Sequence, residues 1–420
     1  MLKRNLIIRA SAYTRSGYGA HARDIIRALW ESNLFNIRLL PTGWGNTSLT
    51  DVIDLKMMDI LHFCSSNTAL GFEDSIFVHL GIPTEFQKLG KYNVGITAGI
   101  ECETLPAKWV EGCNAMDLVI VPSKFTHNVF ITSGVTSKVV VCPEGVDTEV
   151  FSVEAPIDNS VIDSGFFTRN PISTTPKEIN TDFNFLLVGQ WLPYDMGADR
   201  KQIALSIKTF IDTFRYVDNV GLIVKTFTTN TDTPDAYITL QRLEDILRTY
   251  DDKEGIPPIY LIHGDLTDVQ LSSLYRHPTV KGFFTLTSGE GWGRSLAEAV
   301  SCGLPVIAPN WSSYLDFVGD KSSILLPVIM QSVPSIIIQS YRGMFPNNAR
   351  WAMVSEDKAG EGLKKLKHNY DKYKNEALKY APVFQEKFNL TAAYKPLIDV
   401  LVNISPGAVE KISNLRMVKM

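Results

Sequence analysis

Ser288-Gly-Glu-Gly-Trp-Gly-Arg-Ser-Leu-Ala-Glu298 is the stretch of sequence that decides the fold. It follows an apolar run at 282–286 and precedes another at 305–308, so it has the pattern of a glycine-rich turn that leads from a strand into a helix. Glycine lets backbone amides approach a ligand closely, and the first turn of a helix offers unpaired N–H groups and the positive end of its dipole. The stretch therefore predicts a binding site for phosphate groups.

Two glutamates flank the start of this predicted helix. Glu290 lies in the turn, whereas Glu298 lies in the helix, on the face that it shares with Arg294 and Ser295. Carboxylates repel phosphate but accept hydrogen bonds from hydroxyl groups, so sugar or ribose hydroxyls are the ligands that they favour. A structural alternative stays open, in which Glu290 is favoured by the helix dipole and Glu298 is a solvated helix residue.

Apolar runs alternate with amphipathic segments on both sides of this stretch. Such alternation predicts parallel strands joined by crossover helices, and largely apolar runs predict strands covered on both faces. In the first part of the chain we expect strands at 5–9, 60–64, 75–79, 93–97, 118–121 and 138–142, with a helix at 18–32. In the second part we expect strands at 183–189, 221–225, 260–263, 282–286 and 305–308, and helices at 202–214, 236–250, 268–275 and 292–302. Ligands should bind beyond the carboxyl ends of these strands.

Length and composition agree with a two-domain enzyme. A chain of 420 residues is too long for one compact core, and 45% hydrophobic and 20% charged residues are ordinary for a globular protein. No apolar run is long enough to span a bilayer and no signal peptide is evident, so we expect a cytoplasmic protein. The net charge of −4 gives no overall reason to expect nucleic acid, although basic residues gather at positions 3, 4, 9, 15, 23 and 27.

Several motifs resemble those of the family 4 retaining glycosyltransferases. Residues 290–308 resemble the E-x7-E signature of that family, and Ser16-Gly-Tyr-Gly19 resembles its glycine loop. The segments 121–126 and 143–151 resemble the markers that close its first domain, and residues 187–191 with 200–201 resemble the phosphate-binding start of its second domain. The resemblance implies the GT-B fold, an α/β architecture of two Rossmann-like domains that face each other across a cleft.

The resemblance also implies how the chain is divided. We expect an N-terminal Rossmann-like acceptor domain at 1–151 and a C-terminal Rossmann-like nucleotide-sugar domain at 182–385. The connection between them is expected at 152–181, where prolines, serines and threonines follow no sustained period. A C-terminal helical segment at 386–420 is expected to pack back on the first domain.

Roles for the central stretch follow from the resemblance. Glu298 would hold the ribose hydroxyls of the nucleotide and Glu290 would lie against the donor sugar, which agrees with their chemistry as hydroxyl acceptors. The backbone amides of Gly291, Trp292 and Gly293 would contact the diphosphate or the sugar.

Cations for the diphosphate are expected at the start of the second domain. Gly189 would belong to the phosphate-binding turn, and Arg200 and Lys201 would stabilise the charge that develops on the leaving diphosphate. The family usually places an arginine shortly after this glycine, where the present chain has Gln190. Lys225, at the end of a predicted strand, is a further candidate.

Four more positions complete the predicted site. Gly17 and Gly19 would let the first domain reach the donor phosphates, or they form a plain turn before a helix. Glu101 would contact hydroxyls of the acceptor or donor, or it has a structural role at a helix start. His263 lies just before the place where the resemblance puts the nucleotide base, and backbone contacts are expected there.

The implied reaction moves a hexosyl or pentosyl group from a UDP- or GDP-sugar to a hydroxyl acceptor with retention of configuration. No cofactor and no metal are expected, because no Asp-x-Asp motif follows a strand. The acceptor stays open among a glycan, a lipid-linked sugar and a hydroxymethylated DNA base. A sugar-nucleotide epimerase and a non-catalytic sugar-nucleotide-binding subunit are the alternative functions.

Overall fold

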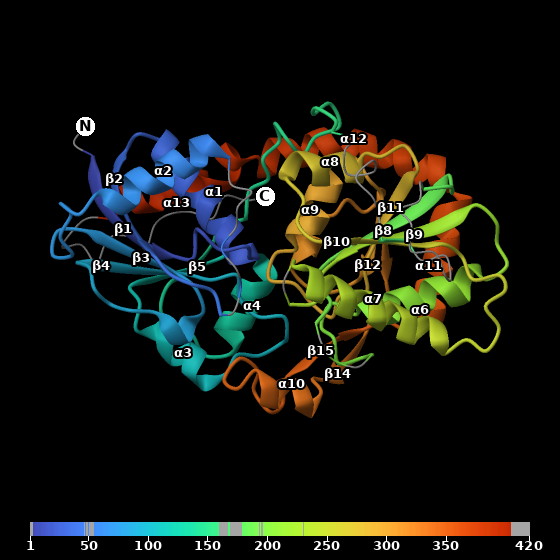
Figure 1. Cartoon of the computed structure of the whole chain (residues 1–420). Coiled ribbons are helices and arrows are strands. Elements are labelled where there is room, and N and C mark those ends of the chain that lie inside the picture. Colours follow the sequence, from blue (N-terminus) through green and yellow to red (C-terminus); the bar gives the residue numbers. More distant parts are fainter. Residues whose placement is uncertain are drawn as a thin grey trace.

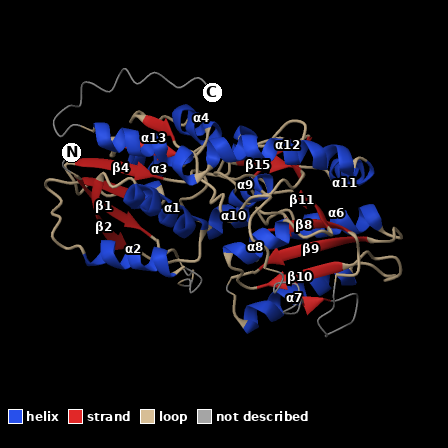
Figure 2. Ribbon diagram, turned by 90° about the horizontal axis from the view of Figure 1, so that it is seen from above, coloured by secondary structure: helices blue, strands red, loops and turns tan. Residues whose placement is uncertain are grey.

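The computed structural model describes residues 3–45, 47, 49, 54–158, 167–168, 179–192, 194, 196–229 and 231–404. These residues form two α/β domains that lie side by side, each built on a mainly parallel sheet with helices against it (Figure 1 and Figure 2). None of the described helices is long and apolar enough to cross a membrane.

The first domain has a six-stranded parallel sheet in the order β2-β1-β3-β4-β5-β6. Every residue of the central strand β3 is buried, because helices cover both faces of a parallel sheet. Its strands are β1 (Arg4–Ala10), β2 (Phe35–Pro41), β3 (Ile76–Leu80), β4 (Tyr92–Ile96), β5 (Leu118–Val121) and β6 (Val139–Val141). Its helices are α1 (Gly17–Glu31), α2 (Leu55–Ser66), α3 (Ala107–Asn114) and α4 (Lys124–Thr132).

The second domain has a seven-stranded sheet in the order β13-β12-β11-β8-β9-β10-β7. The strands are parallel except for β7 (Phe167–Thr168), which pairs antiparallel with β10 (Ile259–His263). The others are β8 (Phe183–Val188), β9 (Val220–Thr226), β11 (Val280–Phe284), β12 (Val306–Pro309) and β13 (Ser323–Leu326). The helices are α6 (Ile203–Phe214), α7 (Thr233–Arg248), α8 (Asp268–Tyr275), α9 (Arg294–Ser301) and α11 (Glu356–His368).

Two further segments of the chain connect the domains. A hairpin of β14 (Ile329–Ser332) and β15 (Arg350–Met353) carries α10 (Ser335–Ser340) to the lower side of the first domain in Figure 1. Helix α12 (Tyr370–Phe388) leads into α13 (Leu390–Asn403), which returns to the first domain. There Tyr394, Leu397 and Leu401 of α13 belong to the core around α1. Residues 405–420 lie outside the described part of the chain.

The structure shows that one predicted strand is wrong, and it adds strands that the sequence analysis did not predict, namely β2, β7, β13, β14 and β15. Residues 60–64 belong to helix α2, where Met57, Ile60, Leu61 and Cys64 form the buried face, so the predicted strand is wrong. Strand β2, which the sequence interpretation missed, pairs with β1 instead. A short apolar run fits a strand or a buried helix equally well, and here the spacing of the buried positions follows the helical period. The expected 152–181 connection lies largely outside the described residues.

Candidate functional site

A cavity of about 550 Å³ lies between the two domains. It is lined by loops that follow strands of both sheets, as expected for ligands of parallel α/β sheets. The predicted site residues that line it are Gly17, Glu101, Gly189, Arg200, Lys201, Lys225, Glu290, Gly291, Trp292, Gly293 and Glu298. The tertiary structure thus brings together residues that are far apart along the chain.

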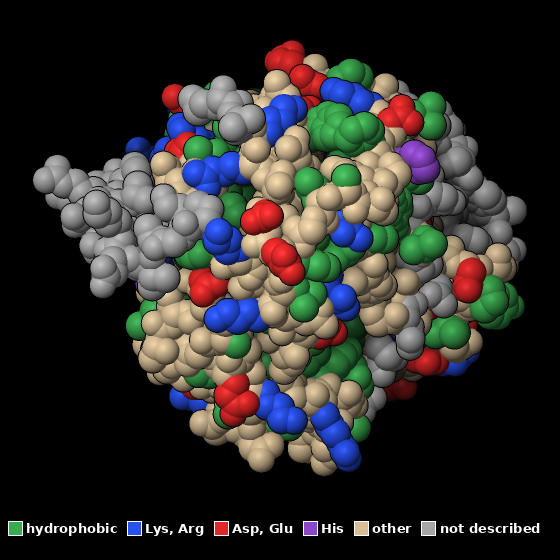
Figure 3. All heavy atoms as spheres, turned by 90° about the vertical axis from the view of Figure 1, so that its left-hand side faces the viewer, with side chains coloured by type: hydrophobic (Ala, Val, Ile, Leu, Met, Phe, Trp, Pro, Cys, Tyr) green, Lys and Arg blue, Asp and Glu red, His purple; other side chains and the backbone are tan. Residues whose placement is uncertain are grey.

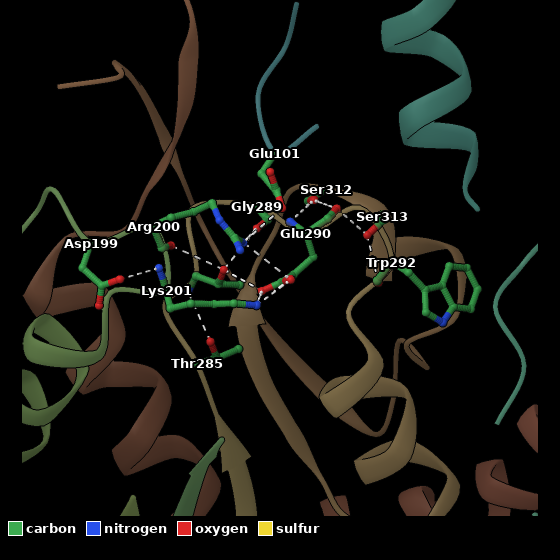
Figure 4. A network of polar contacts seen from close by, with 11 residues as sticks. Glu101, Asp199, Arg200, Lys201, Thr285, Gly289, Glu290, Trp292, Ser312 and Ser313 are labelled. Carbon is green, nitrogen blue, oxygen red and sulfur yellow. Dashed lines mark hydrogen bonds and ion pairs between the residues drawn. The ribbon is translucent and has the colours of Figure 1, made fainter. Parts of the chain in front are cut away.

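The loop before α9 is held rigidly around Glu290. The Ser312 hydroxyl accepts a hydrogen bond from the Glu290 amide at 2.8 Å and donates one to its carbonyl at 2.7 Å. The Ser313 hydroxyl donates to the carbonyls of Glu290 and Trp292 (Figure 4). Gly293 has φ +95°, a conformation that glycine adopts without strain, and α9 begins directly after it. The backbone of this loop is therefore preorganised at the cavity.

Glu290 is the centre of an ion-pair network in Figure 4. Lys201 Nζ lies 2.5 Å and 2.7 Å from the two carboxylate oxygens, and Thr287 donates a hydrogen bond of 2.8 Å. Arg200 lies 3.7 Å from Glu290 and 3.4 Å from Glu101. Burial opposes ionisation, yet Lys201, Arg200 and the two hydrogen bonds hold the pKa of Glu290 below its usual value. Glu290 is therefore an ionised carboxylate beside two cations.

Glu298 has a different environment on α9. Its side chain is buried and accepts a hydrogen bond of 3.1 Å from the Tyr275 hydroxyl. Burial raises the pKa of Glu298 to about 7, although Arg294 opposes the shift. The pKa values of the two glutamates are thus shifted in opposite directions, and a ligand that donates hydrogen bonds to Glu298 would favour its ionised form.

Two predicted residues do not line the cavity. At Gly19 an added Cβ would lie 2.2 Å from the carbonyl oxygen of Thr14, so this glycine is required by packing inside the first domain. The His263 imidazole lies 2.9 Å from Asp235. Asp235 also accepts hydrogen bonds from the loop after β9, so the His263 side chain belongs to a buried structural contact. Backbone contacts at 263 stay a prediction.

Residues that the sequence interpretation did not select also line the cavity. Arg15, next to the glycine loop, forms an ion pair with Asp265 across the domains. The Tyr18 ring stacks on Trp44 with centroids 4.0 Å apart, and both face the cavity. Arg15 and Tyr18 lie beside and within the quoted Ser16-Gly-Tyr-Gly19 motif, so their positions in the sequence were a usable signal. Nothing in the sequence marked Trp44.

One side of the cavity is an apolar wall, made of Ile82, Trp109, Ile337, Tyr341 and Phe345. Ile82 and Trp109 come from the first domain, and the other three come from the α10 segment that the second domain extends. The sequence could not predict this wall, because its two halves are joined only by the packing of α10 on the first domain.

The basic residues near the N-terminus do not form one open patch. Arg23 donates to the carbonyls of Ala12 and Thr14, and Arg27 forms ion pairs with Asp54 and Asp147. On the face drawn in Figure 3, lysine and arginine side chains are scattered among acidic ones. This distribution differs from the continuous basic surface that is typical of nucleic-acid-binding proteins.

Within the described part of the chain, no group of three or more histidine, cysteine, aspartate or glutamate residues is arranged to hold a metal ion. Arg200 and Lys201 are among the positively charged side chains that line the cavity.

Comparison with known proteins places the fold. No family profile matches the sequence, and no curated protein matches it. A sucrose-phosphate synthase from Thermosynechococcus elongatus superposes with a TM-score of 0.60 at 11% identity, covering 95% of this chain and 98% of the other. HepE from Anabaena, in a complex with UDP and glucose, gives 0.59 at 12% identity over 96% and 100% of the two chains. A glycosyltransferase from Rickettsia africae gives 0.62 at 10% identity over 96% and 100%.

These similarities extend over nearly the whole length of each chain and include both sheets. As the sequence predicted, the chain has the GT-B fold, an α/β architecture of two Rossmann-like domains that face each other across a cleft.

Proposed function

We propose that this chain is a retaining glycosyltransferase of the family 4 type that moves a sugar from a nucleotide-diphosphate sugar to a hydroxyl acceptor. One observation carries the proposal: one cavity between two Rossmann-like domains is lined by a preorganised glycine loop, two cations and two glutamates whose pKa values are shifted in opposite directions. HepE from Anabaena, which shares the fold, forms a complex with UDP and glucose, so UDP-glucose is the first donor to test.

The donor would bind mainly to the second domain. Glu298 would accept hydrogen bonds from the ribose hydroxyls, and Gly291, Trp292 and Gly293 would present backbone amides to the diphosphate or sugar. Arg200 and Lys201 would stabilise the charge that develops on the leaving diphosphate. Glu290 would orient the cations and contact the sugar. A nucleophilic carboxylate is not part of this proposal, and retention would follow from attack on the same face of the sugar that the diphosphate leaves.

The acceptor would bind between Glu101 and the apolar wall. Glu101 lies beside Arg200 and lines the cavity, so its carboxylate would accept a hydroxyl proton next to the proposed position of the sugar. The aromatic side chains of the wall favour an acceptor whose hydroxyl is attached to an apolar or flat group.

The direct test incubates the protein with UDP-, GDP- and ADP-sugars and follows nucleoside diphosphate release by mass spectrometry. A glycosyltransferase should release the diphosphate slowly with water and faster with an acceptor. Release together with an epimerised free sugar, independent of any acceptor, would favour an epimerase. Tight binding without release would favour a non-catalytic subunit. The donor found in this way then serves to screen glycans, lipid-linked sugars and hydroxymethylated DNA as acceptors.

Gly291→Ala is expected to lower donor turnover by about 100-fold, because a displacement near 1 Å at a reacting centre has effects of this size. An added Cβ would lie 2.0 Å from the carbonyl oxygen of Ala98, so the loop and the first domain must separate. Turnover is measured as nucleoside diphosphate release. Gly43→Ala is the matched control, since its Cβ meets no atom within 4 Å. Equal rates for both variants would contradict the proposed role of the Gly291 loop in donor binding.

Donor turnover is expected to be the same in excess EDTA as in Mg²⁺, because Arg200 and Lys201 supply positive charge to the diphosphate. Nucleoside diphosphate release under the two conditions is the measurement. A rate that falls in EDTA and returns with added Mg²⁺ would show that a metal ion supplies part of this charge.

A further inference from the structure

Lys225 differs from the other cations of the cavity. Among the described residues, five lysine and arginine side chains line the cavity, and four of them have a carboxylate within ion-pair distance. Among the residues that the structure describes, no carboxylate lies within that distance of Lys225. The four pairs are Arg15 with Asp265, Arg200 with Glu101 and Glu290, Lys201 with Glu290, and Arg294 with Asp24 and Glu144.

The position of Lys225 in the sheet brings it beside the phosphate-binding turn. It lies on β9 opposite Val188 of β8, and its carbonyl accepts a hydrogen bond of 3.1 Å from the Gly189 amide. The next residue of that turn, Gln190, is neutral and donates its side-chain amide to the Thr228 carbonyl at 2.9 Å. At this level of the sheet the positive charge therefore comes from β9 and not from the turn after β8.

The surroundings of Lys225 favour an anionic ligand. Burial lowers the pKa of Lys225 to about 8, the charge of Arg15 acts in the same direction, and Asp265 and Glu298 oppose them. Its ammonium lies 5.6 Å from the centre of the Phe227 ring, a contact that stabilises the positive charge but does not neutralise it. Such a buried ammonium is stabilised when a negatively charged group binds next to it, and a diphosphate in the cavity would supply that charge.

We propose that Lys225 binds the diphosphate of the donor and provides, from strand β9, the cation that Gln190 does not provide. The inference rests on the proposed function, because it assumes a nucleotide-diphosphate ligand. Lys225 would contribute a positive charge at a position where the neighbouring backbone and Gln190 are neutral.

The test compares ligands that differ only in their phosphates. Lys225→Met is expected to weaken binding of UDP by roughly 10- to 100-fold, the effect of losing one charged hydrogen bond, while binding of uridine stays as in the wild type. Isothermal titration of both ligands, and of GDP with guanosine, measures the difference. Lys321→Met is the control, because this exposed lysine lies outside the cavity.

A second test restores the positive charge at a neighbouring position, after strand β8 instead of on strand β9. Gln190→Arg in the Lys225→Met background is expected to restore part of the UDP affinity, because position 190 lines the same cavity beside β9. A merely structural role of Lys225 would reduce UDP and uridine binding alike, and that result would overturn the proposal. Unchanged UDP affinity in Lys225→Met would overturn it too. If the wild-type chain binds none of UDP, GDP and ADP, the proposed function itself fails, which separates the two outcomes.

Discussion

Glu298→Gln is expected to weaken UDP-glucose binding by roughly 10- to 100-fold and to raise the stability of the protein above pH 7 at the same time. The carboxylate is the proposed acceptor of two ribose hydroxyls, and an amide offers only one oxygen. A variant that lost binding because it misfolded would also be less stable. Weaker UDP-glucose binding together with higher stability would therefore identify a ligand-binding role for Glu298.

The sign of the stability change follows from the pKa of Glu298. Burial raises this pKa from 4.5 to about 7 in the folded chain. The folded state therefore holds its proton more tightly than the unfolded state, and the wild type loses stability as the pH rises from about 4.5 through about 7. The loss amounts to about 3 kcal/mol at most, and glutamine does not suffer it because it does not ionise.

Thermal unfolding of the wild type and of Glu298→Gln at pH 5 and pH 8 measures the change in stability, and titration with UDP-glucose measures the affinity. In the wild type, binding of UDP-glucose should strengthen as the pH rises through about 7, because the ribose hydroxyls donate to the ionised carboxylate. The glutamine variant should lack this pH dependence. A variant that binds the donor as well as the wild type would remove Glu298 from the site.

Lys201→Met is expected to reduce donor turnover by about 100- to 1000-fold, the effect of removing one preorganised group that stabilises a leaving anion. It should also destabilise the protein by roughly 3–5 kcal/mol, because Glu290 is buried and loses its nearest cation. Arg200, 3.7 Å from Glu290, still pairs with this carboxylate in the variant and limits the loss of stability.

The double variant Lys201→Met, Glu290→Gln separates the two effects. Neutralising Glu290 removes the unpaired buried charge, so thermal stability should recover while turnover stays low. Unfolding curves and nucleoside diphosphate release are measured on both variants, with Lys364→Met on the exposed face of α11 as control. Recovery of turnover in the double variant would mean that Lys201 acts only by pairing with Glu290.

The ion pairs in the cavity suggest that the donor binds before the carboxylates contact hydroxyl groups. Lys201 and Arg200 are bound to carboxylates that the proposal also assigns to the sugar and the acceptor. If the diphosphate of a bound donor attracted these cations, carboxylate oxygens of Glu290 and Glu101 would become available to hydroxyl groups. Binding of the diphosphate would thereby prepare the carboxylates for their proposed roles, whereas Lys225 has no such pair to give up among the described residues.

The sequence by itself determined the features that depend on neighbours along the chain. The glycine turn before α9 was visible from Gly291 and Gly293, because a close backbone approach and a positive φ both favour glycine. The structure shows the close approach at Gly291, next to Ala98, and the positive φ at Gly293, where α9 begins. The order of apolar runs predicted most strands and the two-domain α/β class, since periodicity is a local property. Glu290 and Glu298 could be placed near one site because both lie close to this turn along the chain.

Only the tertiary structure decided what depends on strand order and on the approach of the two domains. It brought Lys225 beside Gly189 because β8 and β9 pair in one register, and it turned the His263 side chain toward Asp235. It assigned residues 60–64 to a helix, where burial against the first sheet prevails over the β-like composition of a short run. The ion pairs of Glu290 and the apolar wall likewise join segments far apart in sequence, and the energy of such contacts appears only when packing brings their partners together.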